Sequence, residues 1–154
     1  PILAIAPMII VVLNAIGISG LLPKAMISMY LSFFPVVVGM VKGLRAPLRM
    51  QLDQMRTWNA SKTQEFFKLR LPSSMPYFFT SLKIAMAASL VGAIVGELPT
   101  GAVAGLGARL LAGSYYGQTI QIWSALFMAA AVAAAMVGLI GFVQRLTLKR
   151  MGMN

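Results

Sequence analysis

The chain has 154 residues, of which 59% are hydrophobic and 10% are charged, and its mean hydropathy is +0.84. This composition excludes an ordinary water-soluble domain, because such domains are about 45–50% apolar and about 25% charged. The chain has no histidine, no cysteine and only three acidic residues, which excludes histidine-based catalysis, thiol chemistry and most metal sites. It also lacks a phosphate-binding loop of the G-x-x-x-x-G-K-[ST] type. We therefore expect an integral membrane protein with no catalytic residue, no metal site and no cofactor of its own.

Long apolar stretches predict the membrane-crossing helices. A helix that spans a bilayer needs about 20 mainly apolar residues. Pro7 and Asn14 interrupt the first such stretch and Pro35 lies in the second, but neighbouring helices can satisfy the backbone carbonyls that a proline frees. We predict an all-α polytopic bundle of about four transmembrane helices, over residues 2–22, 25–41, 76–95 and 120–143.

The positions of the basic residues predict the orientation. Seven Lys or Arg side chains crowd residues 42–70, against Asp53 and Glu65, and three more cluster at 145–150. Basic residues concentrate in this way on the cytoplasmic side of membrane spans. We therefore expect the loop 42–70 and the C-terminus to lie in the cytoplasm, and we rank nucleic acid as a partner well below the membrane despite the net charge of +10.

The chain starts at Pro1, directly inside an apolar stretch and without an initiator methionine. We expect that further N-terminal spans precede it, and that residues 1–154 belong to a single transmembrane domain of a larger protein.

The basic loop has a helical pattern of its own. Pro47 suits the first turn of a helix, and the helix should stop at Asn59, which accepts the left-handed conformation that ends helices. Its apolar residues recur at helical spacing and form one stripe, made of Leu48, Leu52, Met55 and Trp58. This stripe either rests on the membrane surface and the spans or forms a docking site for a cytoplasmic partner, and pattern alone rates the two about equally.

A second short helix should follow in the same loop. Ser61 and Gln64 have the spacing of a capping box, and the helix should end before Pro72, because the residue preceding a proline disfavours helical geometry. The loop is therefore predicted to be a helix–turn–helix.

Glu97 and a glycine pair follow the third predicted span. An acidic residue near a membrane is a candidate for a substrate or ion path; the alternative, which we favour, is an interface carboxylate that pairs with Arg109 or caps a short helix. Gly92 and Gly96 form a G-x-x-x-G motif, which allows close packing of helices in lipid. Packing within the bundle is the more common use of such a motif, and a dimer interface is the alternative.

The loop resembles the signature of permease subunits of bacterial ATP-binding-cassette importers. That signature is an acidic residue and two alanines, a glycine four residues later, nine further residues and then Ile-x-Leu-Pro. Asp53 takes the acidic position, Asn59 stands where glycine is usual, and Gln54 and Met55 replace the alanines, while the end reads Leu69-Arg70-Leu71-Pro72. The segment Ala60-Ser61-Lys62 resembles the branch that imports nitrate, sulfonates, taurine and pyrimidine-type thiamin precursors.

The resemblance covers nearly the whole chain and implies a six-span permease fold in the inner membrane, of which this chain would hold the C-terminal four spans. It implies alternating-access transport of a small polar solute, driven by separate ATPase subunits that bind ATP and Mg, with a second permease copy and an external solute-binding protein as further partners. Residues 45–72 would be the loop that couples the permease to the ATPase. The residues expected to contact the ATPase are Asp53, Met55, Trp58, Asn59, Ala60, Leu69, Leu71 and Pro72.

Two further expectations concern function. The runs at residues 97–101 and 113–117 resemble permeases for pyrimidine or thiamin precursors.

Two classes of protein remain as alternatives to the importer. One is a channel or carrier that works without an ATPase, and the other is a membrane scaffold that moves no solute.

Overall fold

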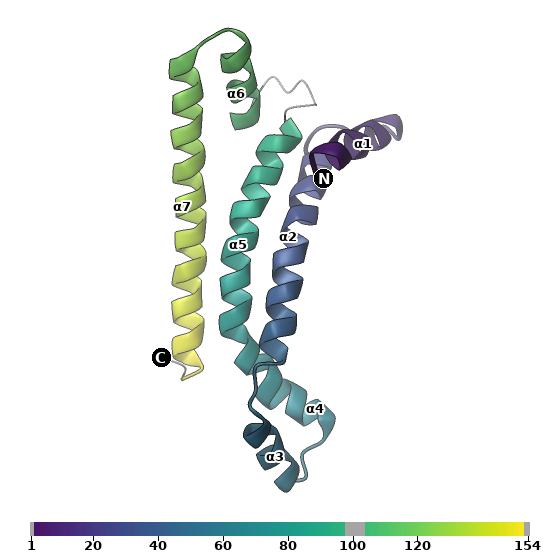
Figure 1. The fold of residues 1–154 in the computed structure, drawn as a ribbon, viewed down its shortest axis with the longest axis vertical. Coiled ribbons are helices and arrows are strands. Elements are labelled where there is room, and N and C mark those ends of the chain that lie inside the picture. Colours follow the sequence, from purple (N-terminus) through teal and green to yellow (C-terminus); the bar gives the residue numbers. More distant parts are fainter. Residues whose placement is uncertain (1, 98–103, 153–154) are drawn as a thin grey trace.

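The computed structural model describes residues 2–97 and 104–152, with side chains from residue 5 onward. These residues form helices joined by turns, without a strand within the described ranges (Figure 1). The elements are α1 (Ile2–Ala15), α2 (Leu21–Leu44), α3 (Arg49–Thr57), α4 (Lys62–Glu65), the π-helical turn η1 (Phe66–Arg70), α5 (Leu71–Glu97), α6 (Leu106–Tyr115) and α7 (Thr119–Arg150). The all-α prediction is confirmed.

Three helices are long and apolar enough to cross a membrane. They cover Leu21–Leu44, Lys62–Glu97 and Thr119–Arg150, and they contain the predicted spans 25–41, 76–95 and 120–143. The second of them combines α4, η1 and α5 into one continuous helix of 36 residues. In Figure 1 the three helices lie side by side, with α5 between α2 and α7.

The first predicted span, over residues 2–22, extends too far at its C-terminal end. Within the described residues, α1 has 14 residues and ends at Ala15, seven positions before Leu22. Gly17 ends the helix with a positive φ angle of 82°, and Gly20, with a φ angle of 90°, directly precedes α2; glycine adopts such angles without steric cost. Helix α1 therefore turns away from the long axis of the bundle and packs on α2 through Ala6, Ile10 and Ile27.

Small residues allow α2 and α5 to approach closely. A Cβ atom added to Gly43 would lie 2.9 Å from the Cβ atoms of Ser74 and Tyr77, and one added to Gly92 would lie 3.0 Å from the Cα atom of Ser28. Gly96 also faces α2, at Ile27 and Lys24. The Gly92–Gly96 motif therefore serves packing within the bundle, as expected for helices in lipid, where close van der Waals contact drives association.

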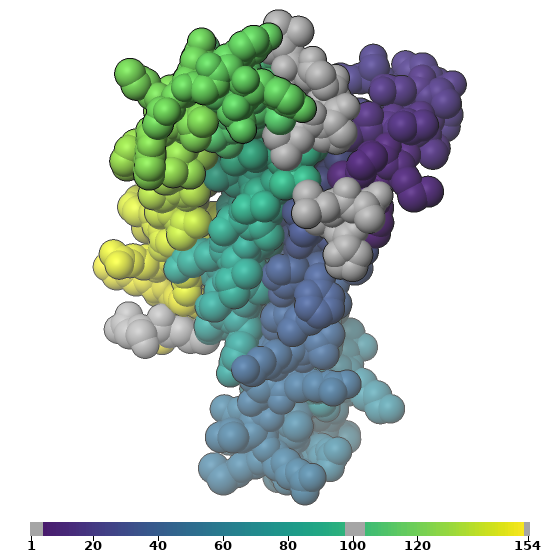
Figure 2. All heavy atoms as spheres, turned by 45° about the horizontal axis from the view of Figure 1, so that its top comes forward, coloured from purple at the N-terminus to yellow at the C-terminus, as the bar shows by residue number. Residues whose placement is uncertain are grey.

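The helices place two groups of connections at opposite ends of the molecule. α3 and α4 lie at one end, where α2 and α7 also finish, whereas α1 and α6 lie at the other (Figure 1). In Figure 2, the loop that contains α3 extends beyond the bundle. The loop and the C-terminal end of α7 thus share one side, which agrees with the relative placement that the basic residues predict.

Candidate functional site: the loop between α2 and α5

Helix α3 begins and ends through local hydrogen bonds. The Gln51 side-chain Oε1 accepts a hydrogen bond of 3.0 Å from the backbone N–H of Leu48, the residue that precedes the first turn. Pro47 therefore lies before the helix and not in its first turn, contrary to the prediction. The stop at Asn59 is confirmed, because Asn59 has a φ angle of +51°.

The turn at Asn59 satisfies the last carbonyl groups of α3. The N–H of Ala60 donates to the carbonyl of Met55 at 3.0 Å, and the N–H of Asn59 donates to the carbonyl of Arg56 at 2.9 Å. These two bonds form the Schellman motif, which requires one left-handed residue after the helix. The turn is therefore defined by backbone geometry at Asn59, and it fixes the direction in which the chain leaves α3.

The apolar stripe of α3 is only partly covered. Leu52 and Met55 are half-buried, whereas Leu48 is 67% exposed and Trp58 is 70% exposed. Asp53 is also exposed and pairs with Arg56 at 3.5 Å, on the same helix. An indole with this exposure at the end of a fixed turn is a candidate contact residue, since tryptophan is enriched among the residues that dominate protein–protein binding.

The second helix of the loop begins as predicted but does not end as predicted. Gln64 N–H donates to Ser61 Oγ at 3.3 Å, and Ser61 N–H donates to Gln64 Oε1 at 3.0 Å, which completes the capping box. The helix then continues through Pro72 as far as Glu97.

A π-helical turn explains how the helix accommodates Pro72. A proline inside an α-helix lacks the N–H for the usual bond and its ring clashes with the carbonyl four residues earlier. Here η1 widens the helix directly before the proline, and the N–H of Leu71 donates to the carbonyl of Phe66, five residues earlier. Such π turns occur as local bulges inside α-helices, frequently at functional sites.

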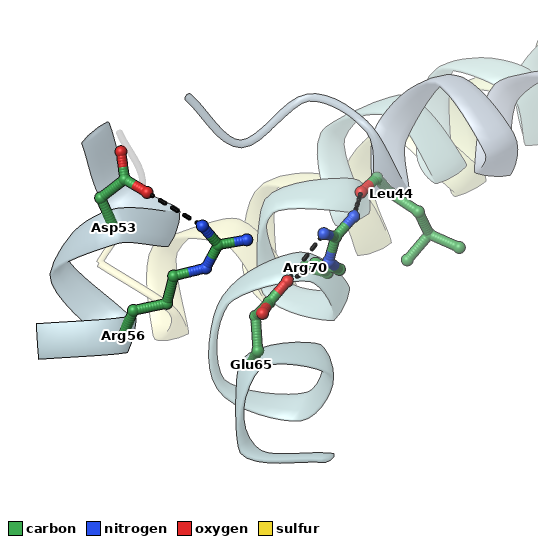
Figure 3. A network of polar contacts seen from close by, with 5 residues as sticks. All are labelled: Leu44, Asp53, Arg56, Glu65 and Arg70. Carbon is green, nitrogen blue, oxygen red and sulfur yellow. Dashed lines mark hydrogen bonds and ion pairs between the residues drawn. The ribbon is translucent and has the colours of Figure 1, made fainter. Parts of the chain in front are cut away.

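Arg70 connects the loop to the spans (Figure 3). Its Nε and one terminal nitrogen each lie 2.7 Å from Oε1 of Glu65, and its other terminal nitrogen donates to the carbonyl oxygen of Leu44 at 3.3 Å. Leu44 is the last residue of α2, so its carbonyl lacks a partner within the helix. The guanidinium group thus joins the end of α2 to the helix that becomes α5.

Sequence reasoning missed this role of Arg70, because the residue occupies the variable position of Leu69-Arg70-Leu71-Pro72. In a regular α-helix, residues five apart point about 140° away from each other. The π turn changes this angle and allows Arg70 to reach Glu65. The residue that could have indicated this contact is Pro72, because a proline inside a long helix requires a local change such as the π turn that precedes it.

The eight residues that the resemblance implies fall into two groups. Asp53, Trp58 and Asn59 are exposed on α3 and its turn. The others are half-buried: Met55, Ala60, Leu69, Leu71 and Pro72. The exposed group is available to a partner, whereas Leu69, Leu71 and Pro72 belong to the helix that enters the bundle.

Glu97 lies at the opposite end of the molecule and caps a short helix. Its Oε2 accepts hydrogen bonds from the N–H groups of Gly107 at 2.7 Å and Ala108 at 3.4 Å, in the first turn of α6. Its Oε1 lies 3.8 Å from Nζ of Lys24 on α2. The expected helix cap is confirmed, but among the described residues the basic partner is Lys24 and not Arg109. Residues 98–101 of the run at 97–101 lie outside the described residues.

The sequence is similar to that of known transport proteins. Residues 1–152 match the family described as binding-protein-dependent transport system inner membrane component. The chain is similar to a probable ABC transporter permease of Haemophilus influenzae, at 30% identity over 86% of this chain and 52% of that protein. It is also similar to the formylaminopyrimidine transport permease of Halalkalibacterium halodurans, at 35% identity over 70% of this chain and 41% of the relative.

A third relative is the riboflavin transport system permease of Chloroflexus aurantiacus, at 28% identity over 97% of this chain and 54% of that protein. The chain thus spans about half the length of these curated relatives. No solved structure matches the chain. Because the family match covers nearly every residue, and the helices and the loop have the expected order, the chain belongs to the family of inner membrane components of binding-protein-dependent transport systems.

Proposed function

We propose that this chain is the part of an importer permease that receives the movement of a separate ATPase and converts it into alternating access. The loop 45–72 would be the contact with the ATPase, on the cytoplasmic side of the inner membrane, and ATP and Mg would be bound by that partner. A second permease copy and an external solute-binding protein would complete the transporter.

The observation that carries the proposal is the exposure of Trp58 at the end of α3, directly before the hydrogen-bonded turn at Asn59. Trp58 is 70% exposed, and the Schellman bonds at Asn59 hold the backbone next to it. Arg49 and Arg56 lie on the same short helix and are exposed. An aromatic anchor with charged groups around it is the usual composition of a protein interface, where the centre is apolar and the rim is polar.

The connection from this contact to the spans supports the coupling role. Movement of α3 would reach the bundle by two routes, the backbone of the continuous helix Lys62–Glu97 and the bond from Arg70 to the end of α2. Both routes lead to helices that pack against each other through the small residues described above. A displacement of the loop would therefore move α2 and α5 together.

The substrate class that we propose is a small polar solute, with a pyrimidine precursor as the first candidate. The relative at 35% identity is a formylaminopyrimidine permease, and others are permeases for riboflavin, bicarbonate and nitrate. Because such different solutes occur among the relatives, the ligand of the associated binding protein is the measurement that identifies the substrate.

The test is a comparison of two tryptophan variants in the intact transporter, reconstituted in proteoliposomes with its ATPase. Trp58→Ala should abolish most of the substrate-stimulated ATPase activity and the uptake. Trp123→Ala is the matched control, since Trp123 is 55% exposed but lies on α7, away from the loop. Unchanged uptake and ATPase activity in Trp58→Ala would contradict the proposal.

The same proteoliposomes test the two alternative classes. Solute uptake in the absence of the ATPase subunit would indicate a channel or an independent carrier. If the ATPase is stably bound but no complete preparation moves the ligand of the binding protein, the chain is a scaffold.

A further inference from the structure

A groove between α5 and α7 combines positive charge with an apolar wall. Its volume is about 530 Å³. The polar residues that line it are Lys83, Gln144 and Arg145, and the apolar ones include Gly138, Phe142 and Leu148. Lys83 comes from α5 and Arg145 from α7, so two helices each contribute one cation to the same space. The coupling role proposed above uses neither residue.

Within residues 2–97 and 104–152, neither of these cations forms an ion pair with a carboxylate. The chain has three acidic residues, and their ion pairs are formed with Lys24, Arg56 and Arg70. Two of these carboxylates lie in the loop, and the third lies at the other end of α5. Two positive charges that share a groove repel each other, and this repulsion weakens when an anion lies between them. The groove therefore favours a negatively charged ligand.

Lys83 lies close to the surface of α7. A Cβ atom added to Gly141 would lie 3.7 Å from Nζ of Lys83, so the lysine side chain reaches across from α5 to the surface of α7. A Cβ atom added to Gly138 would have no neighbour within 4 Å. The groove is thus open about one turn before Gly141 on α7, where its lining residue Val137 is apolar.

The charged and apolar parts are arranged along the direction in which α7 would cross the membrane. Arg145 lies seven residues after Gly138, which is about 10 Å along the helix axis. Lys149 and Arg150 follow at the same end of α7. Phe142 and Leu139, at 64% and 66% exposure, cover the adjacent outer surface. A phospholipid has the same arrangement, with a charged head group at the membrane surface and acyl chains toward the interior.

We propose that this groove binds the phosphate head group of an anionic phospholipid, with Lys83 and Arg145 on the phosphate and an acyl chain along Gly138 and Phe142. One guanidinium group can bind two phosphate oxygens at once through two parallel N–H donors. Basic pockets between membrane helices are known to bind anionic lipid head groups. Gln144 can donate from its side-chain amide to the same oxygens.

The experiment measures phosphatidylglycerol that stays bound to the intact, purified permease subunit, by native mass spectrometry after incubation with phosphatidylglycerol or phosphatidylcholine. Lys83→Gln combined with Arg145→Gln should weaken phosphatidylglycerol binding about 20- to 30-fold, since each basic group near an anionic lipid contributes about fivefold. The control removes the same charge elsewhere, by Arg49→Gln and Lys62→Gln in the loop, and should bind as the parent does.

Two further measurements distinguish a bound lipid from a bound free phosphate. Gly138→Leu fills the groove without removing charge, and it should also reduce phosphatidylglycerol binding. Excess glycerol phosphate should fail to displace the lipid, because it has no acyl chain. The proposal would be overturned if the loop control lost as much binding as the double variant. It would also be overturned by unchanged binding in the double variant or in Gly138→Leu, or by complete displacement of the lipid by glycerol phosphate.

Discussion

The guanidinium group of Arg70 lies 3.3 Å from the carbonyl oxygen of Leu44, across 26 positions of the sequence. This bond closes the loop at its base, where α2 ends and the helix toward α5 continues (Figure 3). The pair with Glu65 at 2.7 Å orients the arginine for this contact. The bond therefore joins the two ends of the loop to each other. A movement of the loop would in this way be transmitted to α2 and α5 together.

Arg70→Gln should reduce coupling while the protein still folds. Hydrogen bonds to charged groups contribute about 1.5–3 kcal/mol, and the partial exposure of Arg70 places its contribution toward the lower end of that range. We expect a several-fold loss of uptake per ATP hydrolysed in proteoliposomes. Arg150→Gln is the control, because it removes an exposed positive charge at the end of α7, outside the loop. Equal coupling in the two variants would contradict the role of Arg70.

Asn59→Val should disturb the turn, and Asn59→Gly should preserve it. The φ angle of +51° costs a β-branched residue about 1–2 kcal/mol, whereas glycine adopts it freely. We expect the valine variant to bind the ATPase more weakly and to lose coupling, measured by co-purification and by substrate-stimulated ATPase activity. If valine and glycine gave the same result, the left-handed turn would not be what the partner requires.

Glu97→Ala should destabilise the end of the molecule that contains α6. It removes a carboxylate that accepts two backbone hydrogen bonds and pairs with Lys24, and loss of a helix cap costs about 0.5–2 kcal/mol. Thermal unfolding in lipid nanodiscs should show the loss. Glu97→Gln should recover part of it, since an amide oxygen can still accept from Gly107. A variant of unchanged stability that has lost uptake would instead indicate that Glu97 contacts the substrate.

Gly43→Ala should be more harmful than Gly96→Ala, although both glycines lie between α2 and α5. The added Cβ at Gly43 would lie 2.9 Å from Ser74 and Tyr77, but at Gly96 the nearest atom would be 3.4 Å away. Overpacking of this kind costs about 1–3 kcal/mol. Gly96→Ala should be neutral or stabilising, because alanine favours a helix over glycine. Denaturant unfolding of the two variants checks the order, and a reversed order would refute it.

The features that sequence predicts best are those with a local physical cause. Asn59 ends α3 because of its own backbone preference, and Ser61 starts the next helix through a bond to a residue three positions away. The long spans follow from hydropathy alone, because lipid requires an apolar surface. Glu97 is predicted correctly as a helix cap, but its partner Lys24 lies on a helix that is distant in sequence.

The features that sequence misses depend on neighbouring turns or on contacts between helices. Pro72 normally predicts the end of a helix, but η1 changes the geometry just before it. The first span is predicted from hydropathy, which does not register that Gly17 and Gly20 take left-handed conformations. The role of Arg70 escapes prediction because its partner, the carbonyl oxygen of Leu44, is a backbone atom, and no residue pattern marks such an acceptor.

The length of α5 has a mechanical consequence. At 27 residues the helix is about 40 Å long, so a tilt of about 5° about one end would displace the other by about 3.5 Å. At that other end, Glu97 holds the first turn of α6 and the start of α2 through Lys24. A small rotation of α5 at its loop end would thus reach α6 and the start of α2 as a translation of several ångströms, which is the kind of movement that the coupling role proposed above requires.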